Sequence, residues 1–454
     1  MRMKTLCALA SILPTLTTAQ LAVNYQRFSL SNGLQIILHE DHSVPVVSTN
    51  IWYHVGSARE KPGRTGFAHL FEHIMFEGSG HVPVGMFDEW LEAAGGDNNA
   101  STNSDRTNYW DNIPSNALEL ALFLESDRMG YLIDAMSPGK VDAQRDVVKN
   151  ERRQSYENQP YGMASIMIDE NLFPPDHPYH WPTIGSMEDL TAASYDDVVE
   201  FFRRFYVPNN ASLVIAGDID REYTRSLVQK WFGEIPTGKP VLPPAPPVAY
   251  VSQEKRLVME DKVQLPRLFI NWITPPHLQP GDAELDVLAS ILTGGKNSRL
   301  YKRLVYDLQI AQDVSANQES QSLSSKFSIE ATARSGHTLA ELESVIREEI
   351  QKLKNTAPSL RELQRAVNLY EAGFLNRLER IGGFGGKADQ LNAYFTETGN
   401  PDYFSEDLAR YRALAPEDIQ SIAMTYLRDD GDVVLSVVPE GKRDLAAPGK
   451  EGGR

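Results

Sequence analysis

Apolar residues recur along this chain with two different periods, and each period predicts one kind of element. Residues 34–40 and 46–55 are short, mostly apolar runs rich in β-branched side chains, which is typical of strands. Residues 118–133 and 339–354 place apolar residues three and four apart, which predicts long amphipathic helices. Strands and helices do not alternate strictly, so we predict an α+β fold rather than a doubly wound parallel sheet.

Two stretches far apart in the chain share one order of elements. Residues 195–220 and 415–441 each predict an amphipathic helix, then a tyrosine, a polar turn and an apolar strand. The two tyrosines, Tyr206 and Tyr426, lie 220 residues apart. Such a repeat predicts two domains of one architecture. The alternative is chance similarity, because a helix, a turn and a strand often follow one another.

A cluster of prolines predicts the boundary between these domains, because neither a helix nor a central strand can run through it. We place the first domain at residues 20–235, a proline-rich linker at 236–250 and the second domain at 251–440. Residues 441–454 are polar and rich in glycine, and we expect them to be disordered. The clustered prolines are Pro236, Pro240, Pro243, Pro244, Pro246 and Pro247.

Residues 1–19 predict a cleaved signal peptide. Arg2 and Lys4 supply positive charge, and an uncharged run that is too short to span a bilayer follows them. The alternative is a buried N-terminal helix, although Pro14 interrupts the run. No later segment is long and apolar enough to cross a membrane, so we expect an exported protein, either periplasmic or secreted.

Composition and charge narrow the possible functions. A chain of 454 residues, with 41% hydrophobic and 23% charged residues, is long enough for two or three globular domains. Its only cysteine, Cys7, lies in the predicted signal peptide, so we expect no disulfide after export. The net charge of −17 argues against nucleic acids or anionic membranes as main partners, because both require basic patches.

One short motif predicts a metal site. His69 and His73 lie four residues apart, so a helix would place both imidazoles on one face, where they can bind the same zinc ion. Glu72 falls beside them and could take a proton from a water molecule at the metal. The alternative is an amphipathic helix with two ordinary histidines. A third ligand is not evident from the residues alone, since Glu151 is one acid among many on the charged stretch 141–162.

Three stretches carry a resemblance to a known family: GFAHLFEHIMFEGS (66–79), GGDNNASTNSDRTNYW (95–110) and QRDVVKNERRQSYENQPYG (144–162). They resemble the pitrilysin and insulinase family of inverted zincin metallopeptidases, which includes the mitochondrial processing peptidase. The resemblance implies two homologous α/β-roll domains, each a mainly antiparallel sheet packed with helices. It further implies one Zn2+ ion per chain.

The resemblance also assigns residues. It makes His69, His73 and Glu151 the zinc ligands and Glu72 the general base. Many relatives carry an acid seven residues before the ligand glutamate, as support for it, where this chain has Gln144. A glutamine accepts hydrogen bonds but adds no negative charge, so we expect a different affinity for zinc.

The stretch 95–110 predicts a glycine turn and a polar strand. By itself it indicates an ordinary hairpin, but the resemblance implies that residues Asn99, Ala100 and Ser101 form an open sheet edge beside the metal. A peptide substrate would bind there in an extended conformation, as an added strand.

The second half lacks a His-x-x-Glu-His motif and departs from active relatives. Alignment with the family places Val305 and Gln312 where relatives have an arginine and a tyrosine that approach the substrate, and valine donates no hydrogen bond. We therefore expect a heterodimer, in which a homologous partner subunit supplies the arginine and the tyrosine. The alternatives are a homo-oligomer with other donors and a weakly active monomer.

The resulting hypothesis is a zinc endopeptidase that cleaves short or unfolded peptides. A non-catalytic assembly or peptide-binding subunit of the same fold is the rival. The glycine-rich segment 380–392 predicts either a hinge near the substrate chamber or a connector between helices. The histidines at 39, 42, 177 and 180 are expected to be turn or packing residues.

Overall fold

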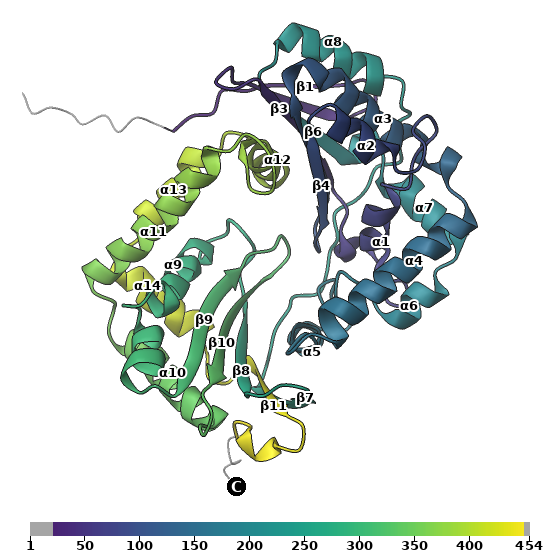
Figure 1. Ribbon diagram of the computed structural model, residues 1–454. Coiled ribbons are helices and arrows are strands. Elements are labelled where there is room, and N and C mark those ends of the chain that lie inside the picture. The colour runs from purple at the N-terminus through teal and green to yellow at the C-terminus, as the bar shows by residue number, and fades with distance from the viewer. Residues whose placement is uncertain (1–20, 449–454) are drawn as a thin grey trace, which may run out of the picture.

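The computed structural model describes residues 21–448 of the chain. The predicted signal peptide and Cys7 lie outside the described residues. Two halves follow each other along the chain, each with its own sheet (Figure 1).

The first half is built on a six-stranded sheet. Its strands are β1 (Gln26–Ser29), β2 (Gln35–Glu40), β3 (Val46–Tyr53), β4 (Asp97–Thr102), β5 (Thr107–Pro114) and β6 (Ala211–Gly217). Its helices are α1 (Phe67–Ile74), α2 (Met86–Ala93), α3 (Leu118–Ala135), α4 (Pro138–Arg152), α5 (Ala164–Leu172), α6 (Met187–Ala192), α7 (Tyr195–Phe205) and α8 (Arg221–Phe232). Short 3-10 turns are η1 (Ser57–Arg59), η2 (Ser115–Ala117) and η4 (Pro208–Asn210), and η3 (Arg153–Glu157) is a π-helix.

The second half is built on a five-stranded sheet. Its strands are β7 (Lys255–Asp261), β8 (Arg267–Thr274), β9 (Ala311–Glu319), β10 (Ser325–Ala333) and β11 (Asp432–Pro439). Its helices are α9 (Asp282–Thr293), α10 (Leu339–Asn355), α11 (Leu360–Leu378), α12 (Lys387–Thr398), α13 (Phe404–Arg412) and α14 (Pro416–Tyr426). The π-helix η5 (Tyr301–Asp307) and the 3-10 turn η6 (Arg443–Leu445) complete it.

The two sheets have the same topology. The strand order is β1-β2-β6-β3-β5-β4 in the first and β7-β11-β8-β10-β9 in the second, so that without β1 the two orders match strand for strand. In each sheet one pair is parallel, β2 with β6 and β7 with β11, and the other pairs are antiparallel. The prediction of an α+β fold with two homologous, mainly antiparallel domains is therefore confirmed.

Each sheet is covered on one face by helices of its own half and on the other by helices of the opposite half. Ile36 and Leu38 of β2 point into the core of the first half, whereas Ile37 between them packs with Leu391 of α12. In the second sheet, Leu435 of β11 packs with α5 from the first half. Because strand residues alternate between faces, these strands must be apolar on both sides, and the two halves interlock.

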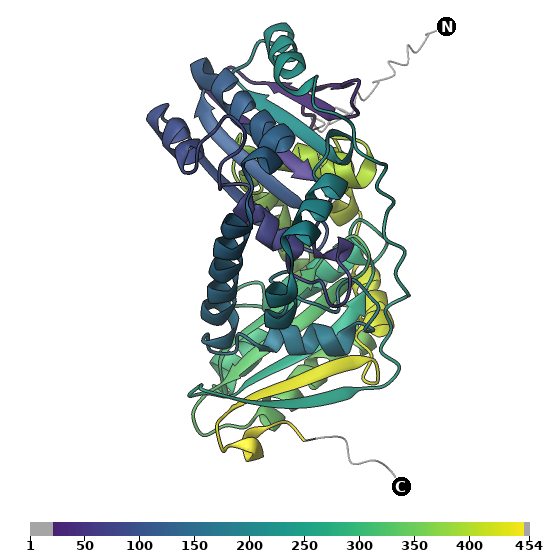
Figure 2. The ribbon, with the colours of Figure 1, turned by 90° about the vertical axis from the view of Figure 1, so that its right-hand side faces the viewer.

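The stretch between α8 and β7 contains no helix or strand and connects the two sheets along one side of the molecule (Figure 2). The predicted linker, residues 236–250, falls within it. Its proline content explains the extended path, since proline fixes φ and lacks a backbone N–H donor. The exact domain boundaries remain predictions.

The end of the chain differs from the expectation of disorder from residue 441 onward. Residues 441–448 make specific contacts: η6 forms there, the buried Ala447 donates its N–H to Ser436 Oγ at 3.1 Å, and Arg443 pairs with Glu260 at 3.2 Å. Polar composition therefore misled the prediction for these eight residues, because specific contacts with β7 and β11 hold them. Residues 449–454 lie outside the described part.

The glycine-rich connector between α11 and α12 lies against the first sheet. A Cβ atom on Gly382 would lie 1.8 Å from Asn112 Oδ1 and 2.4 Å from Ser48 Oγ. Only a glycine therefore fits at this point of contact with β3 and β5. This contact favours the connector interpretation of the segment. None of the described helices is long and apolar enough to cross a membrane.

Candidate metal centre

Helix α1 carries the two histidines, and a buried acid holds its first turn. The N-cap residue, Gly66, has φ of 88° and no side chain to cap the helix. Glu60 replaces a cap, because its carboxylate accepts the N–H groups of Gly66 at 2.9 Å and Ala68 at 2.8 Å. Burial raises the pKa of Glu60 to about 8, although these backbone donors lower it.

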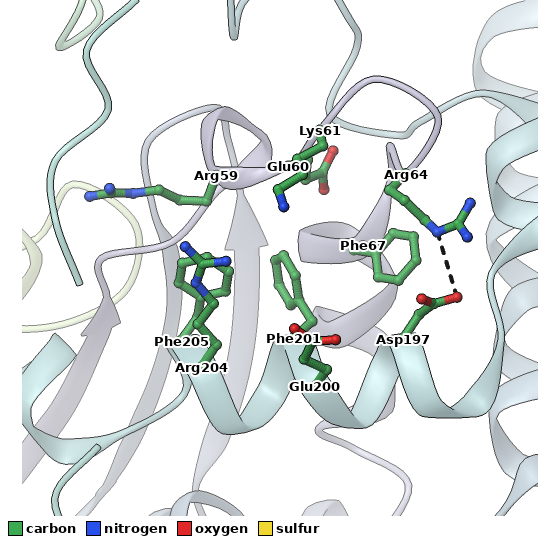
Figure 3. A pocket seen from close by; sticks show the side chains of 10 residues that line it. All are labelled: Arg59, Glu60, Lys61, Arg64, Phe67, Asp197, Glu200, Phe201, Arg204 and Phe205. Atoms are coloured by element: carbon green, nitrogen blue, oxygen red, sulfur yellow. Dashed lines mark ion pairs between the residues drawn. The ribbon is translucent and has the colours of Figure 1, made fainter. Parts of the chain in front are cut away.

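A small pocket of about 140 Å³ lies at this first turn of α1, between the loop at residues 59–64 and helix α7 (Figure 3). Arg64 forms an ion pair with Asp197 of α7 at 3.5 Å, drawn as the dashed line. Phe67 packs with Phe201 of α7, with ring centroids 5.8 Å apart. These contacts fix the start of α1 against α7, and thereby the direction of its histidine-bearing face.

The sequence pattern decides which face of α1 holds the histidines. Phe67, Leu70, Phe71 and Ile74 are buried in the core of the first half. The two histidines and Glu72 occupy the remaining face, as the spacing predicted.

The structure brings Glu151 to these histidines. His73 Nε2 lies 3.3 Å from Glu151 Oε2, and His69 Nε2 lies 3.8 Å from Glu151 Oε1. One ligand atom from each residue lies within 4.8 Å of the others, and this is the one such group of three among residues 21–448. The two imidazole rings are nearly perpendicular, at 84°, with centroids 4.8 Å apart.

Glu151 reaches the site because α4 packs against the same core as α1. Val141 and Val148 of α4 are fully buried there, which sets the rotation of the helix. Glu151 stands in the last turn of α4 with 40% of its side chain exposed, whereas His69 and His73 are 13% and 25% exposed. The carboxylate thus lies on the open side of the group.

Burial keeps both imidazoles neutral. It lowers the pKa of His69 to about 4, and the neighbouring His73 lowers it further. It also lowers the pKa of His73, although the charges of Glu151 and Glu77 oppose this effect. A neutral imidazole nitrogen is the form that binds a metal ion.

Glu72 is held beside this group by a residue of the edge strand. Thr102 Oγ1 donates a hydrogen bond to Glu72 Oε2 at 2.6 Å. Burial raises the pKa of Glu72, which the Thr102 hydrogen bond and the Arg106 charge partly offset. A carboxylate with a raised pKa is a better proton acceptor than an exposed one.

Gln144 does not contact the group of three directly. Its Nε2 atom donates to Glu77 Oε1 at 2.7 Å, and Glu77 lies four residues after His73. Glu77, which accepts this hydrogen bond, carries a negative charge that raises the pKa of His73 and so opposes the effect of burial. Sequence reasoning missed Glu77, although its helical spacing from His73 was visible.

The strand β4 forms an edge of the first sheet, next to β5. Asn99 pairs with Trp110, Ala100 with Tyr109 and Ser101 with Asn108 on the β5 side. Asn99 is exposed, Ala100 is buried and Ser101 is half-buried.

Two further sets of hydrogen bonds involve the backbone of β4. Arg106 donates to the backbone oxygen of Ser101 at 2.7 Å and to its Oγ. The N–H of Ala100 donates to Asn99 Oδ1 at 2.8 Å. The sheet order places no further described strand on the outer side of this edge.

The second half holds no equivalent donors at the aligned positions. Val305 lies in the π-helix η5 and packs on the core of the second half. Gln312 is exposed on β9, which is an edge strand of the second sheet and the counterpart of β4. Neither position places a guanidinium or a phenol near the metal group.

Two adjoining cavities separate the metal group from the second sheet. One, of about 510 Å³, extends from Glu151 to residues of β8 and β10, such as Phe269 and Ser328. The other, of about 250 Å³, shares Tyr156 and Lys326 with it. Lys326 is ion-paired with Asp169 at 2.8 Å, across the boundary between the halves. Sequence reasoning did not single out Tyr156, whose only signal was its place five residues after Glu151.

The fold and this site define a class of protein. Its members are α+β proteins of two matched domains, with an inverted His-x-x-Glu-His helix and a distant glutamate beside it. The family model described as Insulinase (Peptidase family M16) matches residues 35–172. The model described as Peptidase M16 inactive domain matches residues 192–370. The two matches span most of the chain, which belongs to the M16 peptidase family.

Individual relatives agree with this assignment. The chain is 27% identical over 448 residues to the zinc protease PqqE of Helicobacter pylori, covering 96% of this chain and 99% of that protein. A solved protease structure from Helicobacter pylori superposes with a TM-score of 0.86 at 25% identity, covering 92% of this chain and 100% of the other. The first half of the periplasmic protease PqqL from Escherichia coli has a TM-score of 0.77 at 18% identity, covering 95% and 96%, and shows the shared fold alone. The family and these relatives support a zinc peptidase in general terms.

Proposed function

We propose that this chain is a zinc-dependent endopeptidase that binds one Zn2+ through His69, His73 and Glu151. The observation that carries the proposal is the convergence of their ligand atoms within 4.8 Å of one another, although Glu151 lies on another helix, 78 residues after His73. Two imidazoles and one carboxylate are a ligand set of catalytic zinc sites, which leave a fourth position open. The donor chemistry therefore fits zinc.

Glu72 is the proposed general base. When bound, zinc supplies a Lewis acid that polarises the scissile carbonyl and lowers the pKa of water. Glu72 takes the proton of the attacking water and passes it to the leaving amine. Thr102 keeps this carboxylate oriented through its hydrogen bond of 2.6 Å.

The substrate is proposed to be an extended peptide that pairs with β4. Asn99, Ala100 and Ser101 offer backbone groups along an outer edge, and such pairing tolerates many side chains. The cavity of about 510 Å³ beside Glu151 and the adjoining one of about 250 Å³ accept a few side chains, not a folded domain. Short or unfolded peptides are the class of substrate that fits.

A homologous partner subunit is proposed to complete the site. The aligned positions, Val305 and Gln312, provide neither the arginine nor the tyrosine of active relatives, and the matched model of this half is described as an inactive domain. These observations also keep a non-catalytic, peptide-binding subunit as the second candidate. The intact Glu72 beside the metal group favours the enzyme, since peptide binding requires no base.

We further propose export, to the periplasm or the medium. The basic start and uncharged run of residues 1–19 support it.

Two measurements test the function. The purified chain should contain about one zinc ion per molecule, and a chelator should remove both the ion and any cleavage of a quenched, unstructured peptide. Glu72→Gln should retain zinc but lose cleavage, with and without the homologous partner. Glu92→Gln, at an exposed site on α2, is the matched control and should remain active. A metal-free chain, or an active Glu72→Gln, would show the proposal to be wrong.

A further inference from the structure

Tyr156 places a free hydroxyl group next to the candidate metal centre. Its ring packs against the core of the first half, and its hydroxyl has no hydrogen-bond partner among residues 21–448. It lines the larger cavity together with Glu151, and it also lines the smaller cavity next to that one. The residue is therefore anchored on the core and borders the cavity that Glu151 also lines.

A break in helical geometry explains this placement. In a regular α-helix, at about 100° per residue, Tyr156 would lie about 140° around the axis from Glu151. The chain instead forms the π-helix η3 immediately after α4, and Asn158 N donates to Arg153 O, five residues back, at 2.8 Å. The wider turn rotates Tyr156 toward the side of Glu151, and single π turns of this kind are frequent at functional sites.

The phenol has the chemistry that the site lacks. Peptide hydrolysis develops negative charge on the carbonyl oxygen, which catalytic sites stabilise with fixed hydrogen-bond donors. Val305 and Gln312 do not provide them. Burial and the charge of Glu151 raise the pKa of Tyr156, so its hydroxyl remains protonated and able to donate.

We propose that Tyr156 is a catalytic residue, whose hydroxyl donates a hydrogen bond to the carbonyl oxygen of the scissile bond as it becomes negative. This inference rests on the proposed peptidase function. It means that the chain carries one electrophilic donor of its own and cleaves peptides slowly without a partner. A partner subunit then adds hydrogen-bond donors to the Tyr156 hydroxyl and does not supply all the donors of the site.

Tyr161 provides a matched control within the same cavity. It also lines the larger cavity beside Glu151, but its hydroxyl already donates to the backbone oxygen of Leu265 at 2.8 Å. Tyr156→Phe and Tyr161→Phe each remove one oxygen atom and keep the ring. Only the first removes a donor that is free to bind substrate.

The test uses the purified, zinc-loaded chain without a partner, a quenched unstructured peptide, and the same peptide with a phosphonate at the scissile bond. Tyr156→Phe should lower kcat about 10²- to 10³-fold with little change in KM, as the loss of one oxyanion donor does. The inhibition constant of the phosphonate peptide should rise by a comparable factor, while binding of a product peptide and zinc content remain unchanged. Tyr161→Phe, which removes a hydroxyl already bonded to Leu265, should change each constant far less than Tyr156→Phe does.

The outcomes separate this inference from the proposed function. If Tyr156→Phe keeps kcat and phosphonate affinity within about twofold of wild type while Glu72→Gln is inactive, Tyr156 is not the donor and the peptidase assignment stands. Equal losses in Tyr156→Phe and Tyr161→Phe, with a lower melting temperature, would indicate a structural role and also overturn the inference. An active Glu72→Gln overturns the peptidase assignment and this inference with it.

Discussion

Asp389 on α12 makes a polar contact between the second half and the first sheet. Its Oδ1 accepts hydrogen bonds from Trp52 Nε1 at 2.9 Å, Asn108 Nδ2 at 3.1 Å and Asn50 Nδ2 at 3.3 Å. Its Oδ2 accepts the N–H of Gly385 at 2.8 Å. The three side-chain donors lie on β3 and β5 and are buried, with Asn50 and Asn108 fully enclosed.

Asp389→Ala should therefore destabilise the folded chain strongly. A hydrogen bond to a charged acceptor contributes about 1.5–3 kcal/mol, and a buried donor left without a partner costs about 1–3 kcal/mol. The effects of donors that share one acceptor do not add. We expect the free energy of unfolding to fall by about 3 kcal/mol.

Urea denaturation followed by tryptophan fluorescence measures this change, because Trp52 is itself one of the donors. Asp389→Asn is the graded control: it keeps one oxygen acceptor but turns an amide NH2 group toward the others, so a loss of about 1 kcal/mol is expected. Zinc content should stay unchanged in both, since the metal group lies on α1 and α4. A loss below about 0.5 kcal/mol in Asp389→Ala, typical of a surface substitution, would refute this account of how the halves are joined.

Three further predictions concern single side chains. Gly382→Ala should lower the free energy of unfolding by about 1–3 kcal/mol, because its Cβ overlaps side chains of the first sheet. Gly373→Ala, which adds a methyl group in open space on α11, is the control and should be neutral or stabilising. Equal melting temperatures of the two variants would contradict the overlap. Burial raises the pKa of Asp286 from 3.8 to about 7, so its contribution to stability is fully present below about pH 4 and is lost as the pH rises through 7. Asp286→Asn should thus raise the free energy of unfolding at pH 8 by up to about 4 kcal/mol and leave it nearly unchanged at pH 4, and a gain that is independent of pH would contradict the shift. Thr102→Val should reduce kcat/KM about tenfold at unchanged zinc content, because it removes the donor that orients Glu72. Thr102→Ser keeps a hydroxyl and should restore most of the rate. A wild-type kcat/KM in Thr102→Val would show that this hydrogen bond is dispensable.

Local patterns in the sequence predicted much of the fold. The spacing of apolar residues on α1 placed His69, Glu72 and His73 together on the face away from the core, since 3.6 residues per turn decide this without knowledge of other elements. The similarity around Tyr206 and Tyr426 predicted two domains of one topology, and the matched strand orders confirm it. These features depend on residues close together in sequence, so the periodic spacing of apolar residues predicts them.

Contacts between distant residues followed from no such pattern. Glu151 was one acid among many on a charged helix, and only the family resemblance singled it out; its place next to the two histidines depends on how α4 packs through Val141 and Val148. Gln144 stands where relatives carry a supporting acid, and only the structure shows that its amide turns to Glu77. Residues 441–448 read as disordered because their contacts lie on strands far away in the chain.

The sequence by itself determined the elements, the internal repeat and the pair of histidines on α1, because each of these is set by spacing along one segment. Only the tertiary structure decided which side chains meet. The exchange of α5 and α12 between the halves, the capping of α1 by Glu60 and the rotation of Tyr156 toward Glu151 by a π-helix all depend on packing between segments. Packing is a property of the whole fold, so the sequence of one chain predicts such contacts only where a resemblance to relatives points to the residues involved.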